Sequence, residues 1–155
     1  MAGVELSDSL PQIVAVRVQL QQLLLNLIAN AMESMASTDG PQVLCVKCEA
    51  HGDAGVKVSV SDTGAGIGAE DIDRIFDPVV SAKADGLGIG LSICRSIVEA
   101  HSGRLWVGAN APSGAVFQFI LGVDFSGHDS PPKLALIPEH EAAAAARMRL
   151  QVKAK

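Results

Sequence analysis

Two asparagines spaced four residues apart, Asn26 and Asn30, are the first side chains along the chain whose type and spacing could do chemistry. In a helix they would lie one above the other on the same face. Their amide oxygens are ligands that a hard cation such as Mg²⁺ accepts. An isolated pair of this kind is more often part of a solvated polar face, so the pair alone leaves both interpretations open.

A second candidate is the sequence DTGAGIG at residues 62–68, which follows an alternating apolar run. An aspartate that leaves a strand at such a turn can be buried at the sheet edge, where its carboxylate can accept a hydrogen bond from an exocyclic amine. Gly64 and Gly66 would let a flat ring approach the backbone. The same pattern also occurs in ordinary turns, so the function of Asp62 depends on its surroundings.

Three glycines at alternate positions, Gly86, Gly88 and Gly90, follow Lys83 and open a helix-like apolar segment. A dinucleotide fingerprint requires G-x-G-x-x-G directly after an apolar strand. Here the glycine spacing differs and the sequence SAKAD comes before it, which excludes that fingerprint. A glycine-rich loop at a helix N-terminus still favours phosphate, because free N–H groups and the positive end of the helix dipole point at the ligand.

Periodicity predicts the elements that must position these residues. The apolar spacing indicates an amphipathic helix over residues 18–35, and a second helix that starts near Gly90 and stops at Gly103. The inward residues of the second helix are predicted to be Leu91, Cys94, Ile97 and Val98. Strands are predicted at residues 43–49, 56–62, 105–107 and 115–121, the first two of them antiparallel. The segment 69–76 is compatible with a short helix.

Composition excludes several classes of function. The 155 residues carry a formal net charge of -5 and no cluster of Lys and Arg, which argues against nucleic-acid binding. The longest apolar runs fall short of the roughly 20 residues that span a membrane. The first residues also lack the basic and apolar regions of a signal peptide. We therefore expect a soluble, intracellular domain without direct membrane contact.

The three cysteines, an odd number, do not indicate a disulfide framework. Cys45 and Cys48 form a C-x-x-C within a predicted strand, where residues three apart point to opposite faces. That geometry suits neither a metal chelate nor a redox pair. We expect these two residues to be packed thiols.

Four sequence boxes occur in a fixed order along residues 10–122: QLQQLLLNLIANAMESM, SDTGAGI, IFDPVVSAKADGLGIGLSICRSIVEAHSGRLW and VFQFIL. In this order they resemble the ATP-binding catalytic domain of sensor histidine kinases. The resemblance implies a Bergerat-type α/β sandwich, in which helices cover one face of a mixed, mainly antiparallel sheet and ATP lies between the helices and a lid. With the change of composition near the C-terminus, it predicts a catalytic domain at 1–124 and a linker or tail at 125–155.

The resemblance also implies roles for individual residues. Asn30 would bind the Mg²⁺ that bridges the phosphates, and Asn26 would line the same wall. Asp62 would accept the adenine amino group, Ile67 would pack near the ring, and Lys83 would reach the terminal phosphates. The implied catalytic set is Asn26, Asn30 and Lys83, and the implied nucleotide-binding set is Asn30, Asp62, Gly64, Gly66, Ile67, Phe76, Lys83, Gly86, Leu87, Gly88, Ile89, Gly90 and Leu91.

The chain departs from the family pattern in the lid box that contains Phe76. Where many relatives have an aromatic pair after the proline and two threonines before the lysine, residues 79–82 read Val-Val-Ser-Ala. The lid is therefore expected to pack more weakly, although Lys83 and the glycines are intact.

The implied reaction is transfer of the γ-phosphoryl group of ATP to a histidine on a separate dimerisation and phosphoacceptor domain. The histidines of this chain do not suit the acceptor role. His51 falls in a strand connection, His101 at a helix end and His128 in the linker, and His140 follows the catalytic domain instead of preceding it. The expected partners are the acceptor domain and a response regulator, with the isolated domain monomeric and cytoplasmic.

Two other functions stay open on the sequence. The departures at 79–82 are compatible with a regulatory module that binds ATP without transferring phosphate, and the same fold supports protein serine kinases of the anti-sigma type. Related ATPases of the gyrase, chaperone and mismatch-repair group place a glutamate where this chain has Asn26, and an amide is not a general base at neutral pH. We therefore expect very slow ATP hydrolysis by the isolated chain.

Overall fold

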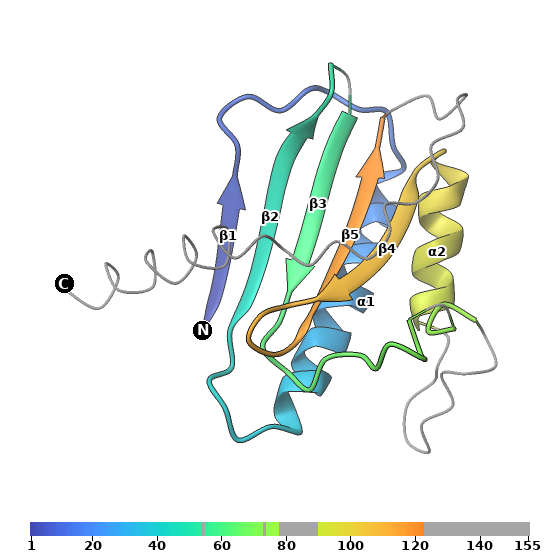
Figure 1. Cartoon of the computed structure of the whole chain (residues 1–155). Helices are drawn as coiled ribbons and strands as arrows, with labels where there is room; N and C mark the ends of the chain where they lie inside the picture. Colours follow the sequence, from blue (N-terminus) through green and yellow to red (C-terminus); the bar gives the residue numbers. More distant parts are fainter. Residues whose placement is uncertain (54, 73, 78–89, 123–155) are drawn as a thin grey trace.

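The computed structural model describes residues 1–53, 55–72, 74–77 and 90–122. In chain order these residues form the elements traced in Figure 1: β1 (Ala2–Leu6), α1 (Arg17–Ala36), β2 (Leu44–His51), β3 (Gly55–Ser61), α2 (Gly90–Ala100), β4 (Arg104–Ala109) and β5 (Ala115–Leu121). Both long predicted helices and all four predicted strands are present. The strand bounds differ from the predicted ones by no more than about two residues, as is usual for element ends.

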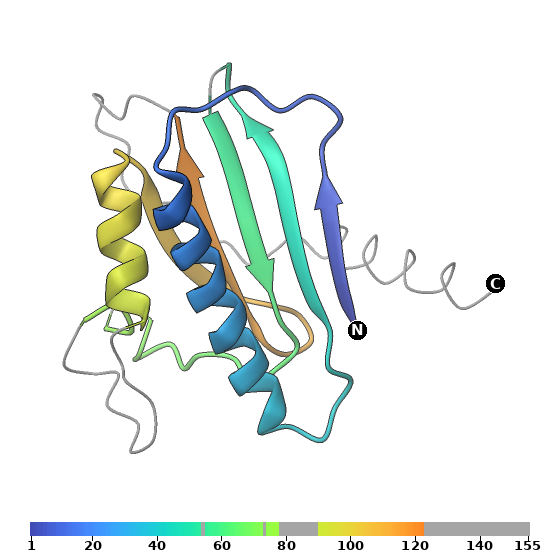
Figure 2. The same cartoon turned by 180° about the vertical axis from the view of Figure 1, so that it is seen from behind.

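The strands form one sheet in the order β1-β2-β3-β5-β4. β1 runs parallel to β2, whereas β2 and β3, β3 and β5, and β4 and β5 pair antiparallel. Figures 1 and 2 show α1 and α2 together on one face of the sheet, with α2 beside β4. This arrangement confirms the predicted two-layer fold, a mixed, mainly antiparallel sheet covered on one face by helices.

The hydrophobic core lies between the helices and the central strands β3 and β5. The register pairs Val58 with Phe119 and Val60 with Phe117. Because residues two apart on a strand share a face, all four side chains turn to the helix side, where they join the core cluster or pack against it. The central strands thus form the surface against which both helices pack.

Each helix buries one apolar stripe. The buried residues of α1 are Leu23, Leu27, Ala31 and Met35, each four positions after the last, and those of α2 are Cys94, Ile97 and Val98. Spacings of three and four keep such residues on one side of a helix, as the sequence predicts. Within the described ranges, neither helix combines the length and apolar character that crossing a bilayer requires.

The N-terminus of α1 has no side-chain cap. Val16 occupies the cap position, where Ser, Thr, Asp or Asn usually accepts a hydrogen bond from the first turn. The backbone N–H of Val16 instead donates to Nε2 of His101 (3.0 Å), and Nδ1 of the same ring lies 2.8 Å from Ile97 O. Both contacts are hydrogen bonds when the ring is neutral and Nδ1 carries the proton. His101 therefore ties the end of α2 to the start of α1.

The end of α2 is a Schellman-type turn whose left-handed residue is Ser102, with φ 52°. Ser102 N donates to Glu99 O (2.9 Å) and Gly103 N donates to Val98 O (2.8 Å). Gly103 is needed for another reason, because a Cβ there would overlap the carbonyl oxygen of Ile120. The predicted stop is right in position, but the expectation that a glycine makes the turn is wrong.

Other parts of the chain differ from the sequence-based expectation or fall outside the structure. β1 has no counterpart among the predicted strands, because its Val4 and Leu6 are 70% and 68% exposed and give no buried periodicity. The segment 69–76 forms successive turns in its described residues, instead of the helix with which its sequence is compatible. Residues 123–155 lie outside the described residues, so the linker or tail stays a prediction.

No disulfide joins the three cysteines, all of which lie in the described ranges. Cys45 and Cys48 lie on β2, and their spacing turns them to opposite faces, as predicted. Burial raises the pKa of the Cys94 thiol to about 11, so Cys94 stays protonated at neutral pH and behaves as a small apolar residue. Among the described residues there is also no group of three or more His, Cys, Asp or Glu that could hold a metal ion.

Candidate functional site

Asp62 follows β3 directly and is only 1% exposed. Its Oδ1 accepts hydrogen bonds from the backbone N–H groups of Gly64 (2.8 Å) and Ala115 (3.3 Å). Its own N–H donates to Ala115 O (3.0 Å), which extends the pairing of β3 with β5 by one residue. The carboxyl group is therefore buried and fixed at the sheet edge, as the turn sequence predicts.

The environment of Asp62 also changes its acidity. Burial raises the pKa of the Asp62 carboxyl above its usual value, and the two backbone hydrogen bonds to Oδ1 oppose the rise. An ionised carboxylate only accepts hydrogen bonds, whereas the protonated group also donates one. The ionised carboxylate is therefore the form that suits an amine, and burial raises the pH above which this form predominates.

The turn that follows, here named the Asp62 turn (residues 62–66), is packed too closely for side chains at two positions. A Cβ at Gly64 would overlap Ser34 of α1. Gly66 has φ +75°, a conformation that favours glycine, and a Cβ there would lie 3.0 Å from Gly114 O. The two glycines thus let the turn contact α1 on one side and the β4–β5 loop on the other. Their contact with a ring stays a prediction.

The Asp62 turn is fastened from both sides. Thr63 Oγ1 accepts a hydrogen bond from the N–H of Val43 (3.0 Å) and donates to Pro41 O. From the β4–β5 loop, Asn110 Nδ2 donates to the main-chain oxygen of Asp62 (2.6 Å). The residues before β2 and those between β4 and β5 therefore hold the turn in one place.

Asn26, Asn30 and Ser34 share one face of α1, because four residues separate each from the next. Asn26 Nδ2 donates to the carbonyl of Gly90, the first residue of α2 (3.3 Å). At the other end of this face, Ser34 lies against Gly64. We name these three residues the α1 strip. It runs from the start of α2 to the Asp62 turn over about 12 Å, at 1.5 Å per helical residue.

Asn30, in the middle of the α1 strip, carries a buried amide nitrogen without a hydrogen-bond partner among the described residues. Buried polar atoms are nearly always paired, and leaving one unpaired costs about 1–3 kcal/mol. This nitrogen therefore indicates a position at which a ligand with an acceptor oxygen would complete the hydrogen bonding.

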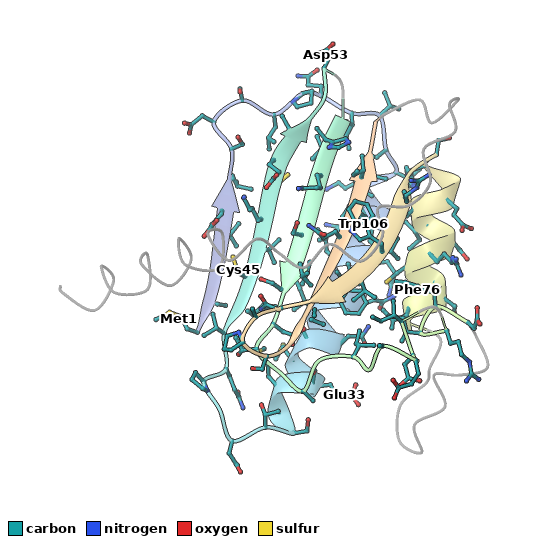
Figure 3. The ribbon with its side chains drawn as sticks, viewed as in Figure 1. Met1, Glu33, Cys45, Asp53, Phe76 and Trp106 are labelled. Atoms are coloured by element: carbon teal, nitrogen blue, oxygen red, sulfur yellow. The ribbon has the colours of Figure 1, made fainter. Side chains whose placement is uncertain are left out.

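Phe76 is part of the core. It is 7% exposed and meets Phe117 edge-on, with ring centroids 6.3 Å apart and an interplanar angle of 86°. The guanidinium of Arg95 lies 5.7 Å from the Phe76 ring centroid, and its Nη1 lies 3.9 Å from Asp77 Oδ1. Figure 3 shows Phe76 beside the end at which α2 begins. Phe76 therefore anchors the described part of the predicted lid box to the core.

The remaining predicted site residues fall into two groups. Ile67 and Leu91 are partly buried and pack against the hydrophobic core. The residues outside the described ranges are Lys83, Gly86, Leu87, Gly88 and Ile89, together with the departures at 79–82. Their roles stay predictions.

Sequence reasoning misses the contact of Asn110 with Asp62. Asn110 stands in the stretch GANAPSG, where only a turn composition is visible, and it lies 48 residues from Asp62. The available signal is weak: an asparagine in a predicted turn between two strands is often a hydrogen-bonding turn residue. The pairing of β5 with both β3 and β4 is what brings the two residues together.

The fold and the site define an ATPase domain of the histidine kinase type. The family model described as "Histidine kinase-, DNA gyrase B-, and HSP90-like ATPase" matches residues 15–124, and the chain belongs to this family. Among curated proteins, the chain is 44% identical over 109 residues to the sensor protein FixL of Bradyrhizobium diazoefficiens. That match covers 70% of this chain and 21% of FixL, so the chain spans about a fifth of the length of this relative.

Solved structures of histidine kinases also match this chain. The catalytic domain of histidine kinase ThkA matches with a TM-score of 0.68 and 33% identity, covering 78% of each chain. Full-length ShkA in complex with AMPPNP matches with a TM-score of 0.67 and 32% identity, covering 77% of this chain and 25% of ShkA. The chain is therefore a catalytic ATPase domain of the kind found in two-component sensor histidine kinases.

Proposed function

We propose that this chain binds Mg²⁺-ATP and transfers the γ-phosphoryl group to a histidine on a separate dimerisation and phosphoacceptor domain. The observation that carries the proposal is the α1 strip, which joins the buried carboxyl of the Asp62 turn to the start of α2. An unpaired buried amide lies between the two ends, on Asn30. This arrangement suits an elongated ligand with an amine at one end and phosphates at the other.

Ionised Asp62 would accept a hydrogen bond from the adenine amino group. Two backbone N–H groups already hold Oδ1, so little reorganisation is needed when the base binds. A base that presents a carbonyl oxygen in place of the amine would set two acceptors against each other and bind less tightly. The AMPPNP complex of ShkA supports a nucleotide as the ligand.

The Asn30 side chain fits the phosphate end of the ligand. Its unpaired nitrogen can donate to a phosphate oxygen, and its amide oxygen belongs to the ligand type that Mg²⁺ prefers. Mg²⁺ usually keeps several waters and binds through one or two protein oxygens together with substrate phosphates. When bound, the ion would neutralise phosphate charge. We assign contact with the terminal phosphates to Lys83 and to the glycines at 86, 88 and 90.

Transfer to histidine requires positioning more than covalent chemistry from the protein. Asn26 donates to Gly90 and accepts from Gln22 Nε2 (2.8 Å). As an amide, it cannot take a proton from water at neutral pH. We therefore expect the isolated chain to hydrolyse ATP very slowly, whereas an imidazole acceptor supplies its own nucleophilic nitrogen.

The proposed partners are the acceptor domain and a response regulator. The chain spans about a fifth of FixL, and ThkA has been solved in complex with the response regulator protein TrrA. Both observations support a role within a longer signalling kinase. We propose that residues 1–124 act as the catalytic domain and 125–155 as a linker or tail. We further propose a cytoplasmic location, where ATP is available, and a monomeric isolated domain.

The test is a reconstituted transfer reaction. The chain is mixed with the acceptor domain of its own kinase, γ-labelled ATP and Mg²⁺, and the labelled residue is identified by mass spectrometry. We expect label on a histidine of the acceptor domain, and none after Asn30→Ala. Label on a serine of the partner, or on His140 of this chain, would contradict the proposal.

A further inference from the structure

The pairing of β3 with β5 is altered at the residue that carries the candidate carboxylate. In a hydrogen-bonded antiparallel pair, two opposite residues exchange both N–H···O bonds. Asp62 and Ala115 exchange only one of them, Asp62 N to Ala115 O (3.0 Å). The N–H of Ala115 donates to the side chain of Asp62, at Oδ1 (3.3 Å). The carboxylate has therefore taken the donor that regular pairing would give to the Asp62 main-chain oxygen.

Asn110 supplies the donor that this oxygen loses. Its Nδ2 lies 2.6 Å from Asp62 O, in a partly buried position. Unpaired main-chain oxygens are unfavourable when buried, so the side-chain amide of Asn110 compensates for the diverted N–H of Ala115. The strand end can then keep its main-chain hydrogen bonding while Oδ1 is held by two N–H groups.

The loop that carries Asn110 is itself closed and pressed against Asp62. Asn110 N donates to Gly114 O (3.0 Å). Gly114 has φ +106°, and a Cβ there would overlap the same Asp62 oxygen that Asn110 binds. A side chain at 114 would push the loop away from the turn. Gly114 thus packs against the main-chain oxygen of Asp62 and Asn110 donates to it, both from the β4–β5 loop.

We propose that Asn110 is a positioning residue for adenine recognition, because it occupies the Asp62 carbonyl and leaves the Ala115 N–H to orient the carboxylate. This role rests on the proposed function. Without the Asn110 amide, the N–H of Ala115 would return to the main-chain oxygen, and Oδ1 would keep only the N–H of Gly64. The carboxylate would then rotate more freely, which weakens binding of the base and leaves binding of the phosphates unchanged.

The experiment compares two nucleotides that differ only in the amine. Dissociation constants for ATP and for purine riboside triphosphate, which lacks the 6-amino group, are measured by titration calorimetry with Mg²⁺ present. The unmodified chain should prefer ATP, and Asp62→Ala should abolish the preference. For Asn110→Ala we expect ATP affinity to fall about fivefold to tenfold, the equivalent of one hydrogen bond, with the affinity for purine riboside triphosphate unchanged.

Two further variants sharpen the result. Asn110→Asp keeps the size of the side chain but removes the donor, so it should lose the preference as Asn110→Ala does. Ser113→Ala alters the same loop at an exposed hydroxyl 3.5 Å from Thr63 O, and it should keep the full preference. Partial unfolding raises the apparent dissociation constants of both nucleotides by the same factor, so moderate destabilisation would leave the ratio between them unchanged.

The outcomes distinguish the role of Asn110 from the assignment of the base to Asp62. If Asp62→Ala abolishes the preference for ATP but Asn110→Ala and Asn110→Asp leave it unchanged, the role of Asn110 is wrong and the proposed function stands. Equal losses for both nucleotides in the Asn110 variants would also overturn that role, because they indicate a general structural effect. If even Asp62→Ala leaves the preference unchanged, both the role of Asn110 and the assignment of the base to Asp62 are wrong.

Discussion

The Asp62 turn and the middle of the α1 strip differ in how completely the protein satisfies their polar groups. At the turn, protein donors serve both Oδ1 and the main-chain oxygen of Asp62. At Asn30, in the middle of the α1 strip and four residues from each of its ends, a buried amide nitrogen has no partner among the described residues. The protein satisfies the polar groups of the first region itself, whereas in the second it leaves a donor that the proposed ligand would pair.

The difference follows from charge. A buried carboxylate is costly unless several donors surround it, and the fold provides two, from Gly64 in the turn and Ala115 at the start of β5. A neutral amide costs far less to leave partly unpaired. The base end of the proposed site is therefore pre-organised, whereas the phosphate end would gain its last hydrogen bond on binding.

Loss of the Asp62 carboxylate should have the largest effect. Asp62→Ala removes the acceptor for the adenine amine, and a hydrogen bond to a charged group corresponds to about 10- to 100-fold in affinity. Titration calorimetry with Mg²⁺-ATP measures this change. An unchanged dissociation constant in a folded Asp62→Ala variant would contradict the proposal that the Asp62 turn recognises the base of ATP.

Loss of the Asn30 amide should weaken Mg²⁺-ATP binding about tenfold, the equivalent of one good hydrogen bond or ligand contact. Unlike most changes at a buried polar atom, Asn30→Ala should leave the free energy of unfolding nearly unchanged, because the nitrogen has no partner to lose among the described residues. Gln19→Ala, an exposed change on the same helix, is the matched control. A large loss of stability in chemical denaturation would show that the protein itself pairs this amide.

Acidification should weaken ATP binding through Asp62. The raised pKa of this carboxyl means that it takes up a proton at a higher pH than an exposed aspartate, whose usual value is about 3.9. The affinity should therefore fall as the pH drops, while in Asp62→Asn it should be lower throughout and independent of Asp62 titration. Affinity measured across the acid range in both proteins provides the test.

The raised pKa of Asp62 also makes the stability of the fold depend on pH, in the opposite direction from the ATP affinity. A carboxyl whose pKa is raised by folding favours the protonated form in the native state, so its contribution to stability is present at low pH and is lost as the pH rises through the folded pKa. Asp62→Asn should therefore be more resistant to denaturant than the unmodified chain at neutral pH, and the advantage should shrink in acid. A less stable Asp62→Asn at neutral pH would contradict this expectation.

The smallest effect is expected away from both regions. Ser102→Gly places glycine at a residue with φ 52° and should stabilise the chain by about 0.5 kcal/mol, since the left-handed conformation costs glycine little. Thermal unfolding measures the gain, and ATP affinity should not change. A change in affinity would show that the end of α2 is coupled to the site.

The parts of the fold that could be predicted are those whose burial repeats along the sequence. α1 repeats its buried residues every fourth position, and β3 alternates valine with polar residues. β1 has no such signal, because Val4 and Leu6 are exposed and only backbone pairing with β2 makes it a strand. Local pattern therefore identifies half-buried elements and misses an exposed edge strand.

The candidate site divides in the same way. Asn30 and Asp62 could be singled out because residue type and spacing carry their signal. The contact of Asn110 with Asp62 spans 48 residues, and that of His101 with Val16 spans 85. Such contacts depend on strand register and helix placement, which no short stretch of sequence encodes. The end of α2 shows the same limit over a short stretch. Gly103 leads to the prediction of a glycine turn, but Ser102 is the left-handed residue and Gly103 is needed for its close contact with Ile120.

The hydrogen bond between Val16 and His101 links the two helices at one end. It joins the end of α2 to the start of α1 at 3.0 Å, whereas Asn26 meets Gly90 at 3.3 Å where α2 begins. Figure 2 shows the two helices running side by side in opposite directions. A ligand that competes for Asn26 or Gly90 would therefore remove one link between the two helices at the proposed phosphate end and leave the bond of Val16 to His101 in place.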